Sequence, residues 1–259
     1  MNIGLSMLFC LGEPFQSMLK RLEEVDVDCV EIVDESEHAL NSKRVQALKR
    51  VATQRGLEFS VHAPFVDINI ASLNPELRRV MLKRLEKSMH FARQLKSRMW
   101  VFHSGWKTGV SEFYPNADWQ LNLRSIRTLL SIARKLDLDI SVENTPEPFP
   151  FLLKTMQEFA LFYSELGSDS DIGLTLDIAH AHTTHQTLEF IEKFSDKIVH
   201  MHASDNNGKY DAHRGIGHGN IDWQAVAKAL KRTNYKGFIM LESIEHMEES
   251  LQTLRQIFT

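Results

Sequence analysis

The feature that most constrains this chain is a regular alternation of short apolar runs, rich in β-branched residues, with longer amphipathic runs. Short β-branched runs are typical of buried strands, and the stretches between them are long enough for crossover helices. The alternation therefore predicts βα units and a parallel sheet. The runs that we predict as strands span residues 3–8, 29–33, 58–62, 99–103, 139–143, 173–177, 198–202 and 237–242.

Helical patterns follow each of these runs. They lie near residues 14–25, 38–55, 75–96, 118–136, 152–166, 186–195, 222–232 and 246–257. In the third, Asn74 is a predicted cap and Pro75 suits the first turn. Its predicted apolar stripe comprises Leu77, Val80, Met81, Leu85, Met89 and Ala92. Eight βα repeats within 259 residues match the roughly 250 residues of a TIM barrel. We therefore predict an α/β fold, a TIM (β/α)8 barrel, formed by a single domain over residues 1–259.

The composition supports a globular protein and gives no signature of a nucleic-acid or membrane partner. Thirty Lys and Arg oppose 34 Asp and Glu, so the formal net charge of -4 lacks the excess of positive charge typical of nucleic-acid binding. Cys10 and Cys29 lie in apolar runs, and we expect buried free thiols. The chain has no basic signal region at its start and no apolar run of the roughly 20 residues that a membrane span needs. We expect a cytoplasmic protein.

Residues of metal-ligand type end nearly every predicted strand from the third onward. They are His62, His103, Glu143, Asp177, His202 and Glu242. Because the C-terminal ends of barrel strands converge on one mouth, these side chains are expected to face one volume. Mixed His, Asp and Glu sets suit Zn2+, Mn2+ or Fe2+, and a carboxylate can bridge two ions. Without a cation the three carboxylates would repel one another, so we predict a divalent-metal site.

The loop after the seventh predicted strand holds a second cluster of such residues. Asp211 and His213 form a D-x-H pair that, with His180, is placed to complete another metal site. The glycines of this loop, Gly215, Gly217 and Gly219, supply the backbone freedom for a tight turn. We predict that four other histidines are not ligands: His182, His185, His200 and His218. His200, which alternates with His202 on its strand, is expected to point away from the barrel interior.

Four stretches of the sequence carry a resemblance to a known superfamily: SVENT, LDIAH, HMHASDNNGKYDAHRGIGHGNID and MLES. With them the chain, from about the third to the eighth predicted strand, resembles the xylose isomerase-like TIM barrels. That group contains sugar and sugar-phosphate isomerases and epimerases. It also contains the apurinic/apyrimidinic endonucleases of the endonuclease-four type. The two branches imply different numbers of metal ions at the same residues.

The isomerase and epimerase branch implies one metal ion, held by Glu143, Asp177, His202 and Glu242. In that branch the two glutamates also flank the substrate carbon and transfer its proton, and His180 contacts substrate oxygens. The endonuclease branch implies three zinc ions. Its first set is His62, His103 and Glu143, its second is the set of four just named, and its third is His180, Asp211 and His213. All nine residue types are present in order, so the resemblance allows one to three ions of Zn2+ or Mn2+.

Substrate size discriminates between the two chemistries. An endonuclease holds DNA largely through Lys and Arg contacts to phosphates, and the predicted loops at the barrel mouth carry few such residues. Lys107, Lys209 and Arg214 are the main ones, and they are our candidate contacts for a substrate phosphate. After Glu143 the chain reads NTPEPFP, without the glycine-rich continuation of the endonucleases.

We therefore favour an isomerase or epimerase of a small sugar or sugar phosphate that transfers a proton beside a carbonyl, with Glu143 and Glu242 as catalytic residues. Three alternatives remain open: a zinc phosphodiesterase of abasic DNA, a metal-dependent lyase or dehydratase of a small molecule, and a non-catalytic metal-binding module. Phe65 and Trp106 are candidate apolar walls for a sugar, although packing at the core edge is the role we favour. For Glu31 we favour a structural hydrogen bond.

Overall fold

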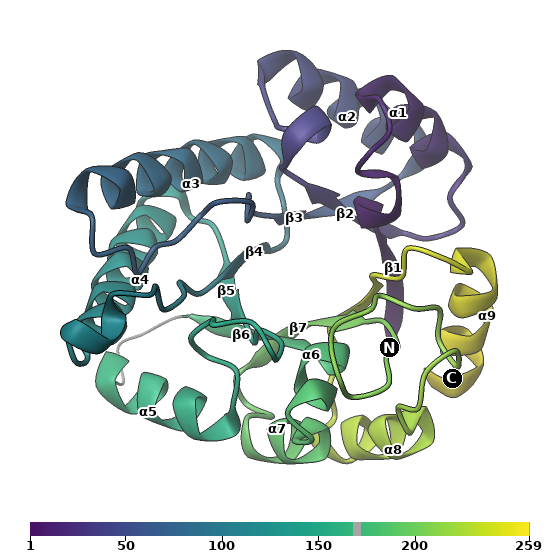
Figure 1. Ribbon diagram of the computed structural model, residues 1–259. Helices are drawn as coiled ribbons and strands as arrows, with labels where there is room; N and C mark the ends of the chain where they lie inside the picture. Colours follow the sequence, from purple (N-terminus) through teal and green to yellow (C-terminus); the bar gives the residue numbers. More distant parts are fainter. Residues whose placement is uncertain (168–171, 259) are drawn as a thin grey trace.

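The computed structural model describes residues 1–167 and 172–258 and contains a closed parallel barrel. Each strand pairs in parallel with the next, and β8 pairs with β1, which closes the sheet (Figure 1). The strands are β1 (Asn2–Ser6), β2 (Cys29–Val33), β3 (Glu58–His62), β4 (Trp100–His103), β5 (Ile140–Glu143), β6 (Gly173–Asp177), β7 (Ile198–Ala203) and β8 (Phe238–Leu241). The predicted TIM barrel is confirmed. The first strand is shorter than predicted, because a 3-10 helix, Met7–Cys10, follows Ser6.

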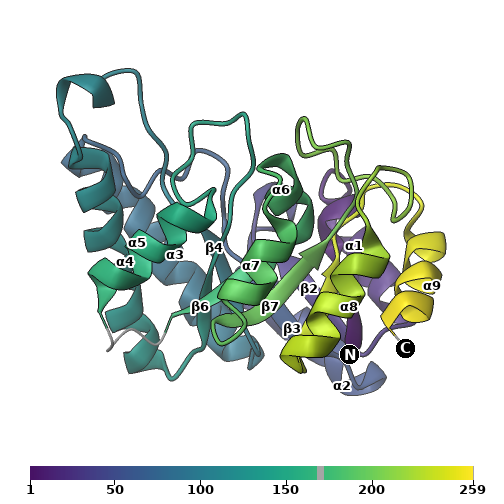
Figure 2. The same cartoon turned by 90° about the horizontal axis from the view of Figure 1, so that it is seen from below.

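Helices surround the barrel, and the loops that follow the strands rise from one edge of it (Figure 2). The helices are α1 (Phe15–Glu24), α2 (Ser42–Arg55), α3 (Pro75–Leu95), α4 (Ala117–Leu136), α5 (Met156–Leu166), α6 (Ile178–Thr183), α7 (Thr187–Lys193), α8 (Trp223–Thr233) and α9 (Met247–Phe258). The short helix α6 was not predicted. It starts directly after β6 because the Asp177 carboxylate accepts a hydrogen bond from the His180 backbone N–H at 2.6 Å. Within the described ranges no helix is both long and apolar enough to cross a membrane.

Helix α3 begins as predicted but buries less of its predicted stripe. The Asn74 side chain accepts from two backbone N–H groups of the first turn, and Pro75 follows it. Leu77 and Val80, however, are 52% and 61% exposed, and the buried face starts at Leu85. The reason is length: the 21-residue helix is roughly 30 Å long, whereas the five-residue strand β3 is roughly 17 Å long. The first turns of α3 therefore extend past the sheet.

Apolar side chains fill the space between the barrel and its helices, while the interior of the barrel contains both apolar and polar side chains. Trp100, Phe102 and Phe159 are among the largest fully buried side chains of the main core. A separate apolar cluster of Cys29, Phe238 and Met240 lies at the N-terminal end of the strands. Both cysteines are buried and free, as predicted. Above that cluster the interior becomes polar, and the change in polarity marks the start of the candidate site.

Candidate functional site

The strand-end residues predicted to be metal ligands lie together at the C-terminal end of the barrel. Their ligand atoms form two groups in which all atoms lie within 4.8 Å of one another. The first group comprises His62, His103 and Glu143, and the second comprises Glu143, Asp177, His202 and Glu242. Except for His103, which is half-buried, these residues are buried. The barrel brings side chains from β3 to β8 to one place, as the register of a closed parallel sheet requires.

Glu143, at the end of β5, connects the two groups. Its Oε2 lies 3.2 Å from His62 Nε2 and 3.1 Å from His103 Nε2, while its Oε1 lies 2.9 Å from His202 Nδ1. Burial favours the neutral acid, but His202 and His103 outweigh it and hold the pKa of Glu143 well below its ordinary value. The residue is thus a buried carboxylate with one oxygen toward each group, the arrangement expected of a bridging ligand.

Asp177 and Glu242 complete the second group. Glu242 Oε2 lies 3.3 Å from His202 Nδ1. Burial, together with the charges of Glu143, Asp211 and Glu242, raises the pKa of Asp177 to about 7. Among the described residues its Oδ2 atom has no hydrogen-bond partner. A buried carboxylate oxygen without a partner is costly, and a divalent cation would relieve both this cost and the repulsion between the carboxylates. The residues present therefore fit such an ion.

The predicted third set lies beside the second group. Asp211 Oδ2 is 3.2 Å from His180 Nε2 and 2.8 Å from His213 Nε2. Burial alone would lower the pKa of His213, but the Asp211 carboxylate raises it to about 9. His213 also has a left-handed backbone, with φ of 44°, a conformation that costs a non-glycine residue about 1 kcal/mol or more. Such strain is typical of functional sites.

Three histidines of the site are oriented by hydrogen bonds between Nδ1 and a backbone carbonyl. Nδ1 of His62, His180 and His213 lies 2.8, 2.8 and 3.1 Å from the carbonyl oxygens of Ala63, Asn144 and Glu242, respectively. Since a carbonyl only accepts, each Nδ1 carries a proton and donates it. Each Nε2 is then the nitrogen left to bind a cation. His202 has the opposite orientation, with Nδ1 toward the carboxylates.

A cavity of about 420 Å³ lies over these residues. Its polar floor comprises His62, His103, Glu143, His180, Asp211, His213 and Glu242. Its apolar walls comprise Leu8, Val33, Phe65, Pro146, Phe149, Phe151 and Ile244. Phe65 thus lines the cavity, whereas Trp106 does not and instead packs edge-on against Phe151, with ring centroids 5.7 Å apart. The cavity combines a floor of ligand-type side chains with walls suited to an apolar face of a small molecule.

The residues predicted to bind a substrate phosphate do not line this cavity. Lys107 and Lys209 are exposed, and Arg214 is half-buried and donates to the carbonyl of His218 at 3.3 Å. Within the described parts of the chain, the cavity lining contains no lysine or arginine. Their contact with a substrate phosphate stays a prediction, because a loop position after a strand does not determine whether a long side chain turns inward.

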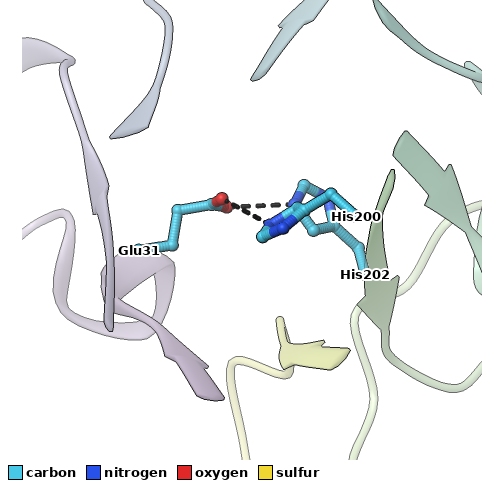
Figure 3. Close-up of side chains that lie close together, drawn as sticks. All are labelled: Glu31, His200 and His202. Carbon is cyan, nitrogen blue, oxygen red and sulfur yellow. Dashed lines mark hydrogen bonds and ion pairs between the residues drawn. The ribbon is translucent and has the colours of Figure 1, made fainter. Parts of the chain in front are cut away.

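The prediction that His200 points away from the barrel interior is wrong. His200 is buried inside the barrel, and its Nε2 lies 3.0 Å from Oε2 of Glu31 (Figure 3). The physical reason is the strand period of two: residues 200 and 202 share one face, and the exposed Val199 lies on the other. The structural hydrogen bond that we favoured for Glu31 is present, since its carboxylate accepts from Ser60 Oγ at 2.9 Å.

His218 lies at the surface with His246 and Glu249, and its assignment as a non-ligand stays a prediction.

Asn144 is a functional residue that the sequence interpretation missed. Its amide is fully buried, accepts from the Asp177 backbone N–H at 2.7 Å and donates to the Asp177 carbonyl at 3.0 Å. Its own carbonyl accepts from His180 Nδ1. Asn144 therefore fixes the relative positions of Glu143, Asp177 and His180. Its place directly after Glu143, inside the SVENT stretch, was the available signal.

Asp205, on the loop after β7, was also missed. Its carboxylate accepts from the backbone N–H groups of Asn206, Gly217 and Ile221 and from Nε1 of Trp223, at 2.9 to 3.3 Å. Its backbone pairs with that of Arg214. A Cβ on Gly219 would lie 2.1 Å from Asp205 Oδ1, so only glycine fits there. Asp205 holds together the loop that carries Asp211 and His213.

Comparison with known proteins confirms the resemblance to the xylose isomerase-like TIM barrels. A family model described as xylose isomerase-like TIM barrel matches residues 19–257. Protein MJ1311 of Methanocaldococcus jannaschii is 33% identical over 251 residues, 94% of this chain and 84% of that protein. D-psicose 3-epimerase of Enterocloster bolteae is 22% identical over 259 residues, 93% of this chain and 82% of the relative. A solved structure of a D-tagatose 3-epimerase-like protein matches with a TM-score of 0.92 and 30% identity, covering 99% of this chain and 97% of the other.

Proposed function

Because the chain belongs to the xylose isomerase-like TIM-barrel family and is an isomerase- or epimerase-like enzyme, we propose that it epimerises or isomerises a free, unphosphorylated sugar with a divalent cation. The observation that supports this most is the pair of glutamates, Glu143 and Glu242, which both line the cavity and both approach His202. Proton transfer beside a carbonyl needs a base on the carbon and a second group to return the proton.

In the proposed mechanism the two glutamates divide the proton transfer between them. One carboxylate removes the proton from the carbon beside the sugar carbonyl. The other, in its acid form, returns a proton to the opposite face, which inverts that carbon. Glu143, Asp177, His202 and Glu242 would hold the cation, which supplies Lewis-acid polarisation of the substrate oxygens. His180 Nε2, at the edge of the cavity, is placed to contact a sugar hydroxyl.

The lining of the cavity favours a neutral substrate. A phosphate group brings about two negative charges, and phosphate sites normally place arginine, lysine or a helix N-terminus against them. Here the described lining offers carboxylates, imidazoles and apolar walls. Phe65, Phe149 and Phe151 provide aromatic surface for the C–H face of a sugar. We therefore propose a free ketose or aldose and place Lys107, Lys209 and Arg214 outside the substrate site.

The test is a deuterium-exchange assay. The purified, Mn2+- or Zn2+-loaded enzyme is incubated with a panel of free ketoses, aldoses and their phosphates in D2O. We expect deuterium to enter the carbon beside the carbonyl of a free sugar, together with its epimer or isomer. The double variant Glu143→Gln/Glu242→Gln is the matched control and should give no exchange. Exchange by that variant, or turnover of phosphorylated sugars alone, would contradict the proposal.

A second candidate function, a zinc phosphodiesterase acting on abasic DNA, is favoured by one observation. The His62, His103 and Glu143 group and the His180, Asp211 and His213 set lie next to the central group, and one-metal proton transfer requires neither. Metal analysis separates the candidates, because three ions per chain favour the phosphodiesterase and one favours the epimerase. Cleavage of an abasic duplex, with no sugar exchange, would establish this second candidate. Elimination of water from a free sugar would instead favour a dehydratase.

A further inference from the structure

Below the candidate metal centre, inside the barrel, lies a buried group that the proposed mechanism does not use. It comprises Glu31 from β2, Ser60 from β3 and His200 from β7, and it meets the metal centre at His202. Figure 3 shows Glu31 facing His200 and His202. Glu31 has no exposed surface, and Ser60 and His200 are 1% and 4% exposed. A fully buried carboxylate carries a desolvation cost of several kcal/mol, so its partners must compensate it closely.

The two oxygens of Glu31 have different partners. Oε2 accepts from Ser60 Oγ at 2.9 Å and lies 3.0 Å from His200 Nε2. Oε1 lies 3.0 Å from His202 Nε2 in an ion-pair contact that is not aligned as a hydrogen bond, and neither of these two atoms has an aligned hydrogen bond to any described atom. Within the described structure these two buried atoms therefore face each other and have no other hydrogen-bond partner. One oxygen anchors Glu31, and the other faces the histidine of the metal centre.

His202 differs from the other anchored histidines of the site in just this respect. His62, His180 and His213 donate Nδ1–H to backbone carbonyls and present Nε2 to the carboxylates. His202 presents Nδ1, with Glu143 Oε1 at 2.9 Å and Glu242 Oε2 at 3.3 Å, and turns Nε2 down into the barrel. Among the described residues no backbone carbonyl accepts from this nitrogen, and the charged side chain of Glu31 lies there instead. Metal-binding histidines commonly donate their second N–H to such a carboxylate.

We propose that Glu31 is a positioning residue for the metal centre: its carboxylate holds the Nε2 proton of His202 and so keeps Nδ1 available to the cation. Ser60 and His200 hold Glu31 in the orientation that this requires. The inference rests on the proposed function only in that it takes His202 to be a ligand. It extends the site from the cavity floor to a second layer on β2, β3 and β7.

The test measures metal affinity in the absence of substrate. Chelator competition with Zn2+ gives the dissociation constant of each ion, and Co2+ absorption reports the geometry of the bound ion. In Glu31→Gln we expect one binding step to weaken by roughly 10- to 100-fold, the usual effect of losing such a partner. The Co2+ spectrum should change at the same step. Glu31→Asp keeps the charge but shortens the side chain, so its Zn2+ affinity should lie between those of wild type and Glu31→Gln. It serves in place of Glu31→Gln if that variant does not fold.

Asp34→Asn is the matched control. Asp34 is another fully buried carboxylate just beyond β2, but its side chain pairs with Arg84 and the Leu40 backbone N–H. Its one contact with a candidate ligand in the described structure is the backbone hydrogen bond from its N–H to the His62 carbonyl, which the substitution keeps. This variant should melt at a lower temperature and bind Zn2+ with unchanged affinity. Unchanged affinity in a folded Glu31 variant, or an equal loss in Asp34→Asn, overturns the inference. Because no sugar is present, the result is independent of the exchange assay: weakened binding without any epimerase activity would refute the proposed function alone.

Discussion

Replacing Glu143 with glutamine tests the centre of the site most directly, because it removes one charge and keeps the shape of the side chain. In the metal-free protein the Glu143 carboxylate raises the pKa of His62 to about 9, against the effect of burial, and it also faces His103 and His202. The pKa of His202 is also raised, whereas burial lowers the pKa of His103. Protons on His62 and His202 therefore supply positive charge that a cation would otherwise supply. Glu143→Gln leaves that charge buried without its partner.

The size of the effect follows from the pKa of His62. A rise from 6.5 to about 9 corresponds to ~3 kcal/mol of stability. Since the folded-state value is the higher one, this stability is fully present below pH 6.5 and is lost as the pH rises through about 9. Glu143→Gln should therefore lower the free energy of unfolding of the metal-free protein by ~3 kcal/mol at pH 6, and by much less at pH 9.5. For a chain of this size the loss at pH 6 is roughly 6–12 °C in Tm.

The assay is urea unfolding of chelator-treated protein at both pH values, with the exposed-site variant Glu23→Gln as control. We expect wild type to lose stability between pH 6 and 9.5 and the variant to change less. Metal analysis of the same variant should show fewer ions per chain, since both groups lose a shared ligand. A loss at pH 6 below about 1 kcal/mol, or an equal loss at both pH values, would refute the assigned role of Glu143.

Three further predictions concern other parts of the site. Glu242→Gln should remove most sugar exchange in the D2O assay, because ligation and proton transfer both suffer; near-normal turnover would exclude it as a catalytic residue. His213→Ala should lower the metal content and spare the central ion, and mass spectrometry showing one ion per chain before and after would reject a multinuclear site. Asp205→Asn should make residues 206–220 more sensitive to protease, since its carboxylate accepts three backbone N–H groups; an unchanged digestion pattern would contradict its bracing role.

The sequence predicts well what depends on local pattern and strand order. The β-branched runs fix the strands, and the shared direction of parallel strands places residues such as His62 and Asp177 at one end. Nine His, Asp and Glu residues, which lie at the ends of strands β3 to β8 or shortly after them, are enough to predict a metal centre. Asn74 and Pro75 likewise set the start of α3 correctly because capping is a local interaction.

The errors and omissions concern interactions between distant residues. Glu31 and His200 meet across the barrel, 169 positions apart in the chain, and no short-range pattern reveals that contact. Asp205 gathers donors from a loop whose path is set only by tertiary packing. Lys107 and Lys209 follow strand ends in the chain, but their side chains are exposed and outside the cavity lining. Chain position alone gives no information on side-chain direction. A free sugar could be preferred over its phosphate only once the cavity walls were known.

The network around Asp205 has a consequence for how quickly the protein can exchange metal. The loop that carries Asp211 and His213 is folded around a single carboxylate and a close glycine contact, and neither Asp205 nor Gly219 is a candidate ligand. We therefore expect this network to hold the loop in place without an ion, so that an incoming ion displaces protons from imidazoles while the chain keeps its path. Uptake at this position should therefore follow the rate of proton release and should keep its speed even in viscous solution.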